Sequence, residues 1–381
     1  MPVSSHPPKL HVLVVDDSAM VRQVMESILG SDERIEVSVA ADPLIALRKI
    51  QQRLPDVVVT DLEMPRMDGL SFLRKIMEEF PLPVVICSGF AARGTEMALR
   101  ALEEGAIEII SKPKLGVREF LNDSAVILLD AVWSAAQARA LPRRRASLPK
   151  QSAADVASVP GSRHIQDSPL QLIAVGASTG GTEALRTFLS TMPQDCPPIA
   201  IVQHMPEVFT RAFAERLDKE CLIKVKEARD GETLRQGEAL IAPGNLHTLV
   251  ERGGSGLKVK VVPGGLVSRH RPSVDVLFRS VAIAAGPSAI GIILTGMGDD
   301  GAQGLLEMKT AGAVTIAQDE TSSVVFGMPR EAIAKGAVDL VLALEKIGPC
   351  VLNLITRSRD CTQTDPTNRA RLRDSQLRRG A

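Results

Sequence analysis

Short apolar runs recur along the first part of this chain, and each is followed by a stretch with helical spacing of apolar residues. A run that is apolar at every position, rather than at alternate ones, is typical of a strand buried on both faces of a parallel sheet. Five such runs stand at Leu10–Val15, Ile35–Val39, Val57–Thr60, Val84–Cys87 and Ile107–Ile110. The pattern predicts a doubly wound α/β domain with a five-stranded parallel sheet over residues 9–138, ending in a helix over Val117–Ala138.

The same alternation resumes after residue 169 and predicts a second, larger α/β domain over residues 169–356. Strand-like runs stand at Leu172–Val175, Ile199–Val202 and Ala289–Leu294, and helices are expected over about 206–219, 274–285 and 301–311. Between them, Leu246–Arg252 and Leu257–Val262 flank a Gly-Gly-Ser-Gly turn, which indicates an antiparallel hairpin. We therefore expect a doubly wound, mostly parallel sheet with a β-hairpin appended.

Two segments have compositions that cannot form a core of their own. Residues 139–168 are rich in Ser, Ala and Pro around the basic run Arg143–Arg145, and we expect a flexible tether there. Residues 357–381 are Arg-rich and polar without apolar periodicity, so a disordered tail is expected. A short basic run of this kind is usually solvated, which argues against a nucleic-acid interface.

The overall composition excludes several classes of protein. Since 45 acidic residues balance 45 basic ones, no net charge attracts the chain to nucleic acid or to a membrane surface. The five cysteines include no C-x-x-C pair, which is typical of reduced thiols rather than of disulfides or a zinc site. No signal-like start is present, and no apolar run approaches the roughly 20 residues that span a bilayer. We therefore expect a cytoplasmic protein that is not inserted in a membrane.

Charged and hydroxyl side chains follow the predicted strands of the first domain, at the edge where ligands bind in such sheets. They are Asp16 and Asp17 after the first strand, Asp61 after the third, Ser88 after the fourth and Lys112 after the fifth. Three carboxylates that converge at one edge repel one another and favour a hard divalent cation such as Mg²⁺. The lysine and the hydroxyl could then bind a phosphoryl group on Asp61. Each residue alone could be a helix cap or a solvated loop residue, but the coincidence of all five favours a functional site.

A serine stands in a Gly-rich turn directly after the first strand of the second domain, at Gly176–Gly180. The spacing G-x-S-x-G around Ser178 is that of a nucleophile elbow, in which a strand turns sharply into a helix and exposes the serine. The helix expected over about 182–189 directs its free N–H groups towards the same point. The alternative is a phosphate-binding turn of a dinucleotide fold.

The dinucleotide alternative requires an acidic residue that the sequence lacks. An acidic residue should end the next strand to bind a ribose, but Gln203 and His204 stand there. The chain also has no tyrosine, which removes the Tyr-Lys pair of many reductases. The hydrolytic interpretation is therefore favoured.

A serine becomes a strong nucleophile only when a base takes its proton and an anion holds that base in the correct tautomer. His204 follows the second strand of this domain and Asp300 follows the later one, so both could meet Ser178 at one sheet edge. Four other residues remain as alternatives for the anion or as substrate-binding or ordinary loop residues: Asp275, Asp299, His247 and His270.

Three motifs of the first domain occur together: Asp16-Asp17, Asp61 in D-L-E-M-P-R-M-D-G, and Lys112-Pro113. With them, the domain resembles the receiver domain of two-component response regulators. The resemblance implies that a histidine kinase of the chemotaxis type phosphorylates Asp61 and that the three aspartates hold Mg²⁺. It also implies that Ser88 and Lys112 act as the receiver switch and that the Lys112-Pro113 peptide bond is cis. The chain departs from the pattern at Ile109, where many receivers carry an aromatic switch residue.

Four motifs of the second domain also occur together: G-A-S-T-G-G at Gly176–Gly181, Q-H-M-P at Gln203–Pro206, R-H-R-P-S-V-D at Arg269–Asp275 and T-G-M-G-D-D-G at Thr295–Gly301. With them, the domain resembles the chemotaxis methylesterase (CheB) family. Together the two resemblances cover nearly the whole chain apart from the tether and the tail.

The second resemblance implies that Ser178 is the nucleophile, His204 the base and Asp300 its orienting partner. It places Thr179 and the backbone N–H of Met297 where the oxyanion is stabilised. The implied substrates are methyl esters of glutamate on the helices of methyl-accepting chemoreceptors, with deamidation of receptor glutamines as a second activity and no cofactor in the catalytic domain. It further implies inhibition by an unphosphorylated receiver lying across the serine. A different hypothesis is that the protein is a response regulator that acts by binding a partner, and that the triad of its second domain catalyses no reaction.

Overall fold

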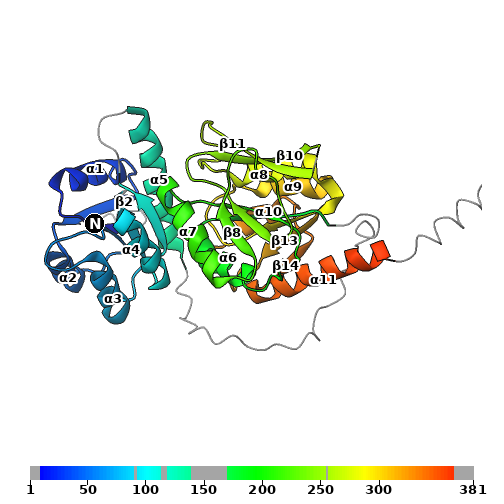
Figure 1. The fold of residues 1–381 in the computed structure, drawn as a ribbon. Coiled ribbons are helices and arrows are strands. Elements are labelled where there is room, and N and C mark those ends of the chain that lie inside the picture. The colour runs from blue at the N-terminus through cyan, green and yellow to red at the C-terminus, as the bar shows by residue number, and fades with distance from the viewer. Residues whose placement is uncertain (1–8, 90–91, 113–117, 139–169, 255, 364–381) are drawn as a thin grey trace, which may run out of the picture.

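Two α/β units make up the described part of the chain (Figure 1). The computed structural model describes residues 9–89, 92–112, 118–138, 170–254 and 256–363. The predicted tether, the Lys112-Pro113 peptide bond and most of the predicted tail lie outside these ranges. Within them, no helix is both long and apolar enough to cross a membrane.

The N-terminal unit has a five-stranded sheet of order β2-β1-β3-β4-β5, in which all neighbouring strands are parallel. Its strands are β1 (Leu10–Val15), β2 (Ile35–Ala40), β3 (Val57–Thr60), β4 (Val84–Ser88) and β5 (Glu108–Ser111). Its helices are α1 (Ala19–Leu29), α2 (Pro43–Gln52), α3 (Gly69–Glu79), α4 (Ala92–Glu103) and α5 (Arg118–Gln137). The predicted fold of this unit is confirmed, with β5 displaced from the predicted strand by one residue.

The alternation of β1 divides the core of this unit into two layers. Val12 and Val14 point towards α1 and α5, whereas Leu13 and Val15 point towards α2, α3 and α4. Because both faces of the sheet are covered, the strands are apolar at every position, as the sequence indicated.

The C-terminal unit has a seven-stranded, wholly parallel sheet of order β14-β13-β12-β6-β7-β9-β8. Its strands are β6 (Leu172–Ala177), β7 (Ile199–Gln203), β8 (Lys224–Glu227), β9 (Glu238–Ile241), β12 (Ala289–Ile293), β13 (Val314–Gln318) and β14 (Leu340–Leu342). Its helices are α6 (Gly181–Leu189), α7 (Glu207–Glu220), α8 (Val274–Ala284), α9 (Ala302–Thr310), α10 (Met328–Ala334) and α11 (Leu344–Gln363). The prediction of a second, larger α/β sheet is confirmed.

The predicted hairpin is present as β10 (His247–Gly253) and β11 (Gly256–Val262), which form a separate antiparallel sheet. It packs on α8, where the hydroxyl of Ser280 accepts a hydrogen bond from the N–H of Val250 at 2.8 Å.

Two features of the C-terminal unit differ from the sequence-based expectations. Strands β8, β9, β13 and β14 were not predicted. Three of them, β8, β9 and β14, have only three or four residues, and β13 carries the polar residues Thr315 and Gln318. The prediction that a disordered tail begins at residue 357 is wrong for 357–363, since α11 continues to Gln363. Apolar residues in the first half of this helix, such as Val351 and Leu354, are buried, and the helix packs on α6 and β13.

The N-terminal unit docks on the C-terminal unit through α4, α5 and the start of β5 (Figure 1). Helix α4 packs against α7, where Glu103 and Arg216 form an ion pair. Helix α5 lies over the carboxyl edge of the second sheet. The functional edge of the second sheet therefore faces the first unit.

Candidate active site

Ser178 lies in the turn between β6 and α6, at the carboxyl edge of the second sheet. The chain leaves β6 towards β7 on one side while β12 lies on the other side, so this edge is the topological switch point where ligands bind in such folds. Gly180 has a φ of 76°, a left-handed conformation that glycine adopts without strain, and α6 begins directly after it. The predicted strand–turn–helix around Ser178 is confirmed.

Neighbouring strands fix the backbone of this turn. The amide of Gln203, at the end of β7, donates a hydrogen bond to the carbonyl oxygen of Ser178 at 2.9 Å. On the other side, the N–H of Ser178 donates to the carbonyl oxygen of Thr295 at 3.0 Å, and the Thr295 hydroxyl donates to the carbonyl oxygen of Thr179 at 2.9 Å. The serine is therefore held between the ends of β7 and β12.

His204 follows β7, Asp300 lies in the loop after β12, and their side chains meet at this edge. His204 Nε2 lies 2.8 Å from Asp300 Oδ2, and the two side chains are 6% and 0% exposed. The N–H of His204 also donates to the carbonyl oxygen of Ala177, the residue before Ser178, at 3.1 Å. The structure thus brings together the three residues that the sequence singled out.

The other ring nitrogen of His204 is not engaged by Asp300. Nδ1 is buried and has no hydrogen-bond partner within the described part of the chain. No hydrogen bond joins it to Ser178 in this arrangement, in which the first unit is docked. Because Asp300 occupies Nε2, Nδ1 is the ring atom left free to accept a proton.

Asp300 is held by the N-terminus of α8 as well as by His204. It accepts hydrogen bonds from the Ser273 hydroxyl at 2.7 Å and from the backbone N–H groups of Val274 and Asp275 at 2.7 Å and 3.1 Å. Burial alone would raise the pKa of Asp300, but the hydrogen bond and charge of His204, and the Ser273 hydroxyl, lower it below the ordinary value. Apart from its position before a predicted helix, nothing in the sequence marked Ser273 as part of this site.

His270 stacks on the ring of His204, with ring centroids 3.7 Å apart and an angle of 13° between the planes. Burial, together with the neighbouring His204, lowers the pKa of His270 well below its usual value. A ring that stays neutral therefore covers one face of His204 and limits its contact with water.

The residues that remained as alternatives have other partners. Asp275 accepts hydrogen bonds from the Gly304 N–H at 2.7 Å and from the Ser268 hydroxyl at 3.1 Å, so it links α8 to α9.

Asp299 is exposed and its carboxylate lies 3.4 Å from Arg269. His247 is hydrogen-bonded to the carbonyl oxygen of Gly265 and to the backbone N–H at the start of α8. Of Asp275, Asp299 and Asp300, only Asp300 is hydrogen-bonded to His204.

Two hydrogen-bond donors lie beside Ser178. Met297 lies in the loop next to it, since a Cβ placed on the neighbouring Gly296 would come within 2.7 Å of the Ser178 Cβ. Among the described residues the N–H of Met297 has no hydrogen-bond partner. The hydroxyl of Thr179 is engaged by the first unit: it donates to Glu108 Oε2 at 2.9 Å and lies 2.6 Å from the Ser134 hydroxyl.

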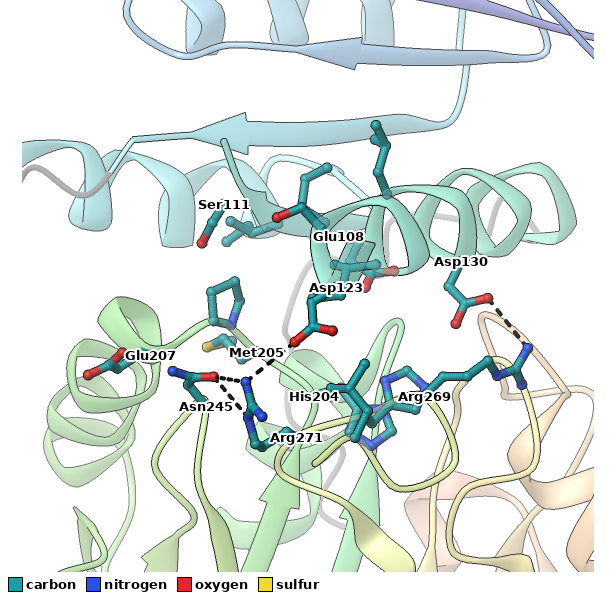
Figure 2. A pocket seen from close by; sticks show the side chains of 18 of the residues that line it. Glu108, Ser111, Asp123, Asp130, His204, Met205, Glu207, Asn245, Arg269 and Arg271 are labelled. Carbon is teal, nitrogen blue, oxygen red and sulfur yellow. Dashed lines mark hydrogen bonds and ion pairs between the residues drawn. The ribbon is translucent and has the colours of Figure 1, made fainter. Parts of the chain in front are cut away.

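A cavity of about 170 Å³ remains between the two units beside His204 (Figure 2). Acidic side chains of α5 form one wall and arginines of the 269–271 loop form the other. Arg269 Nη1 lies 3.5 Å from Asp130 Oδ1, and Arg271 Nη2 lies 3.6 Å from Asp123 Oδ2. Burial raises the pKa of Glu108 to about 7 and also raises that of Asp130. The docked first unit thus closes the edge that carries Ser178.

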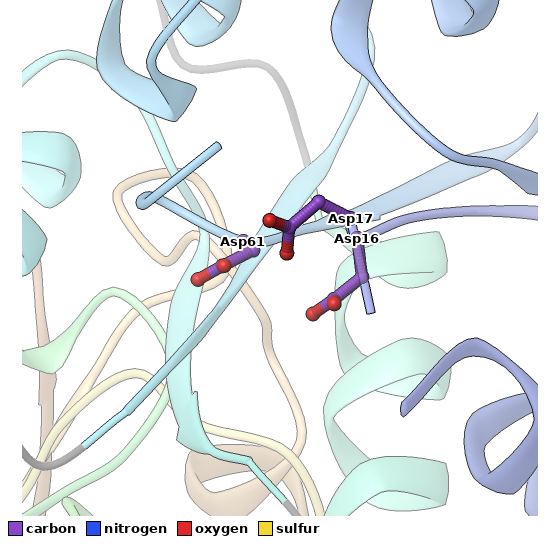
Figure 3. Close-up of side chains that lie close together, drawn as sticks. All are labelled: Asp16, Asp17 and Asp61. Atoms are coloured by element: carbon purple, nitrogen blue, oxygen red, sulfur yellow. The ribbon is translucent and has the colours of Figure 1, made fainter. Parts of the chain in front are cut away.

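The acidic residues of the first unit lie together at the switch point of its sheet (Figure 3). Asp16, Asp17 and Asp61 each offer a carboxylate oxygen within 4.8 Å of the others, a spacing that suits a small divalent cation. Lys112 Nζ lies 2.8 Å from Asp16 Oδ2 and 2.7 Å from Asp61 Oδ2. Ser88 ends β4 at the same edge and is buried.

The two units and their sites define a two-domain protein, in which a domain with an acidic phosphoacceptor-type pocket covers a serine-hydrolase-type site. Residues 12–121 match the family model of the response regulator receiver domain, and residues 173–351 match that of CheB methylesterase. The chain belongs to the CheB methylesterase family, whose curated relatives it matches along nearly their full length.

Two relatives and one solved structure illustrate this similarity. Protein-glutamate methylesterase/protein-glutamine glutaminase 3 of Geobacter metallireducens is 57% identical over 91% of this chain and 99% of its own length. The corresponding protein 5 of Anaeromyxobacter dehalogenans is also 57% identical, over 91% of this chain and 96% of its own. A crystal structure of the Thermotoga maritima CheB methylesterase catalytic domain is 36% identical and covers 48% of this chain and 98% of its own, with a TM-score of 0.47.

Proposed function

We propose that this protein is a phosphorylation-activated serine hydrolase. It removes methyl esters from glutamate side chains of methyl-accepting chemoreceptors, releasing methanol, and deamidates receptor glutamines. The observation that carries the chemistry is the buried contact of 2.8 Å between His204 and Asp300, at the same sheet edge as Ser178. The names of the relatives support the substrate.

In the proposed reaction, Ser178 Oγ attacks the carbonyl carbon of the ester while His204 Nδ1 takes the hydroxyl proton. Asp300 accepts from Nε2, so it fixes the tautomer and stabilises the imidazolium that forms. The proton then passes to the leaving oxygen, methanol departs and an acyl-serine remains. A water molecule, deprotonated by the same histidine, hydrolyses the acyl-serine and leaves a glutamate carboxylate. An amide substrate follows the same steps and releases ammonia.

The oxyanion of the tetrahedral intermediate needs donors that are already in place. The N–H of Met297 has no other partner among the described residues and lies beside Ser178. The hydroxyl of Thr179 can serve as a second donor once Glu108 and Ser134 move away from it. The docked arrangement is therefore the inactive one.

In the first unit, we assign Asp61 as the phosphoacceptor and Asp16, Asp17 and Asp61 as the Mg²⁺ ligands. The spacing of their oxygens within 4.8 Å supports this assignment. A bound Mg²⁺ would neutralise charge on the transferring phosphoryl group. Lys112 and Ser88 lie where they can contact that group after transfer. The phosphodonor is a histidine kinase of the chemotaxis type, and the protein acts in the cytoplasm.

Methanol release from methylated receptor membranes tests the proposed function. Phosphorylated protein should release methanol, whereas a Ser178→Ala variant of equal stability should not. The competing hypothesis, a regulator that acts only by binding a partner, requires the two proteins to behave alike in this assay.

A further inference from the structure

Helix α5 turns one polar face towards the catalytic edge. Asp123, Asp130 and Ser134 are seven and then four residues apart, a spacing that places side chains on one face of a helix. The two carboxylates point towards arginines of the second unit (Figure 2). Ser134, which is buried, contacts Thr179 next to the proposed nucleophile.

The arginines opposite α5 are part of the loop that holds the catalytic base. Arg269 and Arg271 stand on either side of His270, whose ring stacks on His204 at 3.7 Å. Arg271 is held in place by two hydrogen bonds to the side-chain oxygen of Asn245, at 2.9 Å and 2.6 Å. A guanidinium fixed in this way loses little conformational freedom when it binds a carboxylate.

The two arginines carry charge that the chemical steps do not use. In the docked protein their side chains are 50% and 20% exposed, and each faces one carboxylate of α5. Within the catalytic unit, Arg269 also has Asp299 at 3.4 Å, but no ion pair to that unit is present for Arg271 among the described residues. When the first unit leaves, a cationic rim therefore faces the incoming substrate.

We propose that Arg269 and Arg271 are substrate-recognition residues, which bind two carboxylates on one face of the receptor helix, and that α5 occupies their site as a stand-in for that helix. This inference rests on the proposed function, which supplies a helical, glutamate-bearing substrate. Charge pairs at the rim of an interface chiefly set register and partner choice. The arginines would therefore position the ester over Ser178 rather than take part in the reaction.

The contacts of α5 also give the register of the substrate. Position 134 of α5 is the one that reaches Thr179, and the two carboxylates precede it by four and eleven residues. A substrate helix in the same place would carry its ester four residues after one carboxylate and eleven after another.

The test uses the full-length protein, phosphorylated by a small-molecule donor, and two otherwise neutral helical peptides. Both peptides carry one glutamate γ-methyl ester. One has aspartates four and eleven residues before the ester, and the other has asparagines there. We expect kcat/KM to be roughly tenfold higher for the acidic peptide at low salt, mainly through KM, and the preference to shrink as salt rises. The variant R269Q/R271Q should hydrolyse the two peptides with equal kcat/KM.

A matched variant breaks the same ion pairs from the other side. D123N/D130N should keep the full preference for the acidic peptide, because the arginines are intact. The unmodified protein alone decides the matter if R269Q/R271Q does not fold: equal kcat/KM for both peptides overturns the proposal. If neither peptide is hydrolysed although methylated receptors are, the proposed register is wrong and the proposed function stands. If receptors are not demethylated either, the proposed function itself fails.

Discussion

Glu108 on β5 accepts a hydrogen bond of 2.9 Å from the hydroxyl of Thr179, the residue that follows the proposed nucleophile. The two residues belong to different units, so this bond links the receiver directly to the active site. The product of the proposed reaction is also a glutamate carboxyl. The docked receiver therefore presents to the catalytic edge the same chemical group that the reaction would leave there.

This link makes docking sensitive to pH. Burial raises the pKa of Glu108 to about 7, from an ordinary value of 4.5. The docked state consequently binds the proton more tightly than the undocked state, so docking is strongest at low pH and weakens as the pH rises from about 4.5 to 7. Asp130, whose pKa burial also raises, acts in the same direction. We predict that unphosphorylated activity, divided by phosphorylated activity at the same pH, rises by roughly tenfold between pH 5 and 8.

Glu108→Gln is the control for this prediction, because the amide keeps the shape of the side chain and its acceptor oxygen but does not titrate. The ratio should lose most of its pH dependence in this variant. At pH 8 the variant should also dock more tightly and be less active without phosphate. A variant with the pH profile of the unmodified protein would show that other groups govern docking.

The second prediction concerns the assigned triad. Ser178→Ala and His204→Ala should each lower turnover by roughly 10⁴-fold or more, with unchanged thermal unfolding. Asp300→Asn should be nearly as damaging, because an asparagine cannot hold the tautomer in which Nδ1 accepts the serine proton. Methanol release by phosphorylated protein is the measurement.

Asp275→Asn and Asp299→Asn are the matched comparisons. Asp299 is exposed and Asp275 bonds to Gly304 and Ser268, so neither substitution should approach the loss caused by Asp300→Asn. Activity that survives Asp300→Asn but disappears in either comparison would exclude the assigned triad.

The sequence was sufficient to place the site because of where its residues stand relative to strands. Ser178, His204 and Asp300 each follow a buried parallel strand or its loop, and the carboxyl ends of such strands meet at one edge. The same geometry gathers Asp16 and Asp61 in the first unit. Short buried runs therefore predicted which residues share a sheet edge before any tertiary contact was known.

Other features depend on packing between distant segments and left no periodic signal. Ser273 holds Asp300 only because α8 packs beside the loop after β12, and Glu108 reaches Thr179 only because the two units dock. Strand β14 has three residues and partly exposed side chains, so neither its length nor its pattern marks it as a strand. Ile109, which stands where many receivers carry an aromatic switch residue, is buried in the receiver core next to Glu108.

The third prediction concerns the phosphoacceptor. Asp61→Asn should abolish phosphate uptake from a small-molecule donor, and uptake by the unmodified protein should require Mg²⁺. The three carboxylates repel the incoming phosphoryl group unless a cation offsets their charge. Phosphate incorporation is measured with and without excess chelator. Undiminished uptake in chelator would exclude the assigned metal pocket, and Glu63→Gln, a change outside this cluster, should leave uptake intact.

The last prediction concerns coupling between the two sites, for which β5 provides a direct connection. Lys112, directly after β5, contacts Asp61 at 2.7 Å, and Glu108, at the start of β5, contacts Thr179. A phosphate on Asp61 would give Lys112 a new partner and thereby displace the strand that carries Glu108. The equilibrium between the docked and undocked states then shifts towards the undocked one. The shift in free energy can be no larger than the difference in the interactions that the phosphate makes in the two states.

Loosening the docked state elsewhere should therefore replace phosphorylation in part. Glu103→Lys replaces the α4 partner of Arg216 by a like charge, outside the cavity and without changing the catalytic unit. We expect its unphosphorylated activity to rise several-fold, since the exposed ion pair contributes modestly to docking and the charge reversal adds repulsion.

A fragment from about residue 165 to the C-terminus should be faster than the unphosphorylated full-length protein, and phosphorylation should raise only the full-length rate. If the fragment is folded yet no faster, occlusion does not explain the control, and the receiver must activate the enzyme through contacts of its own.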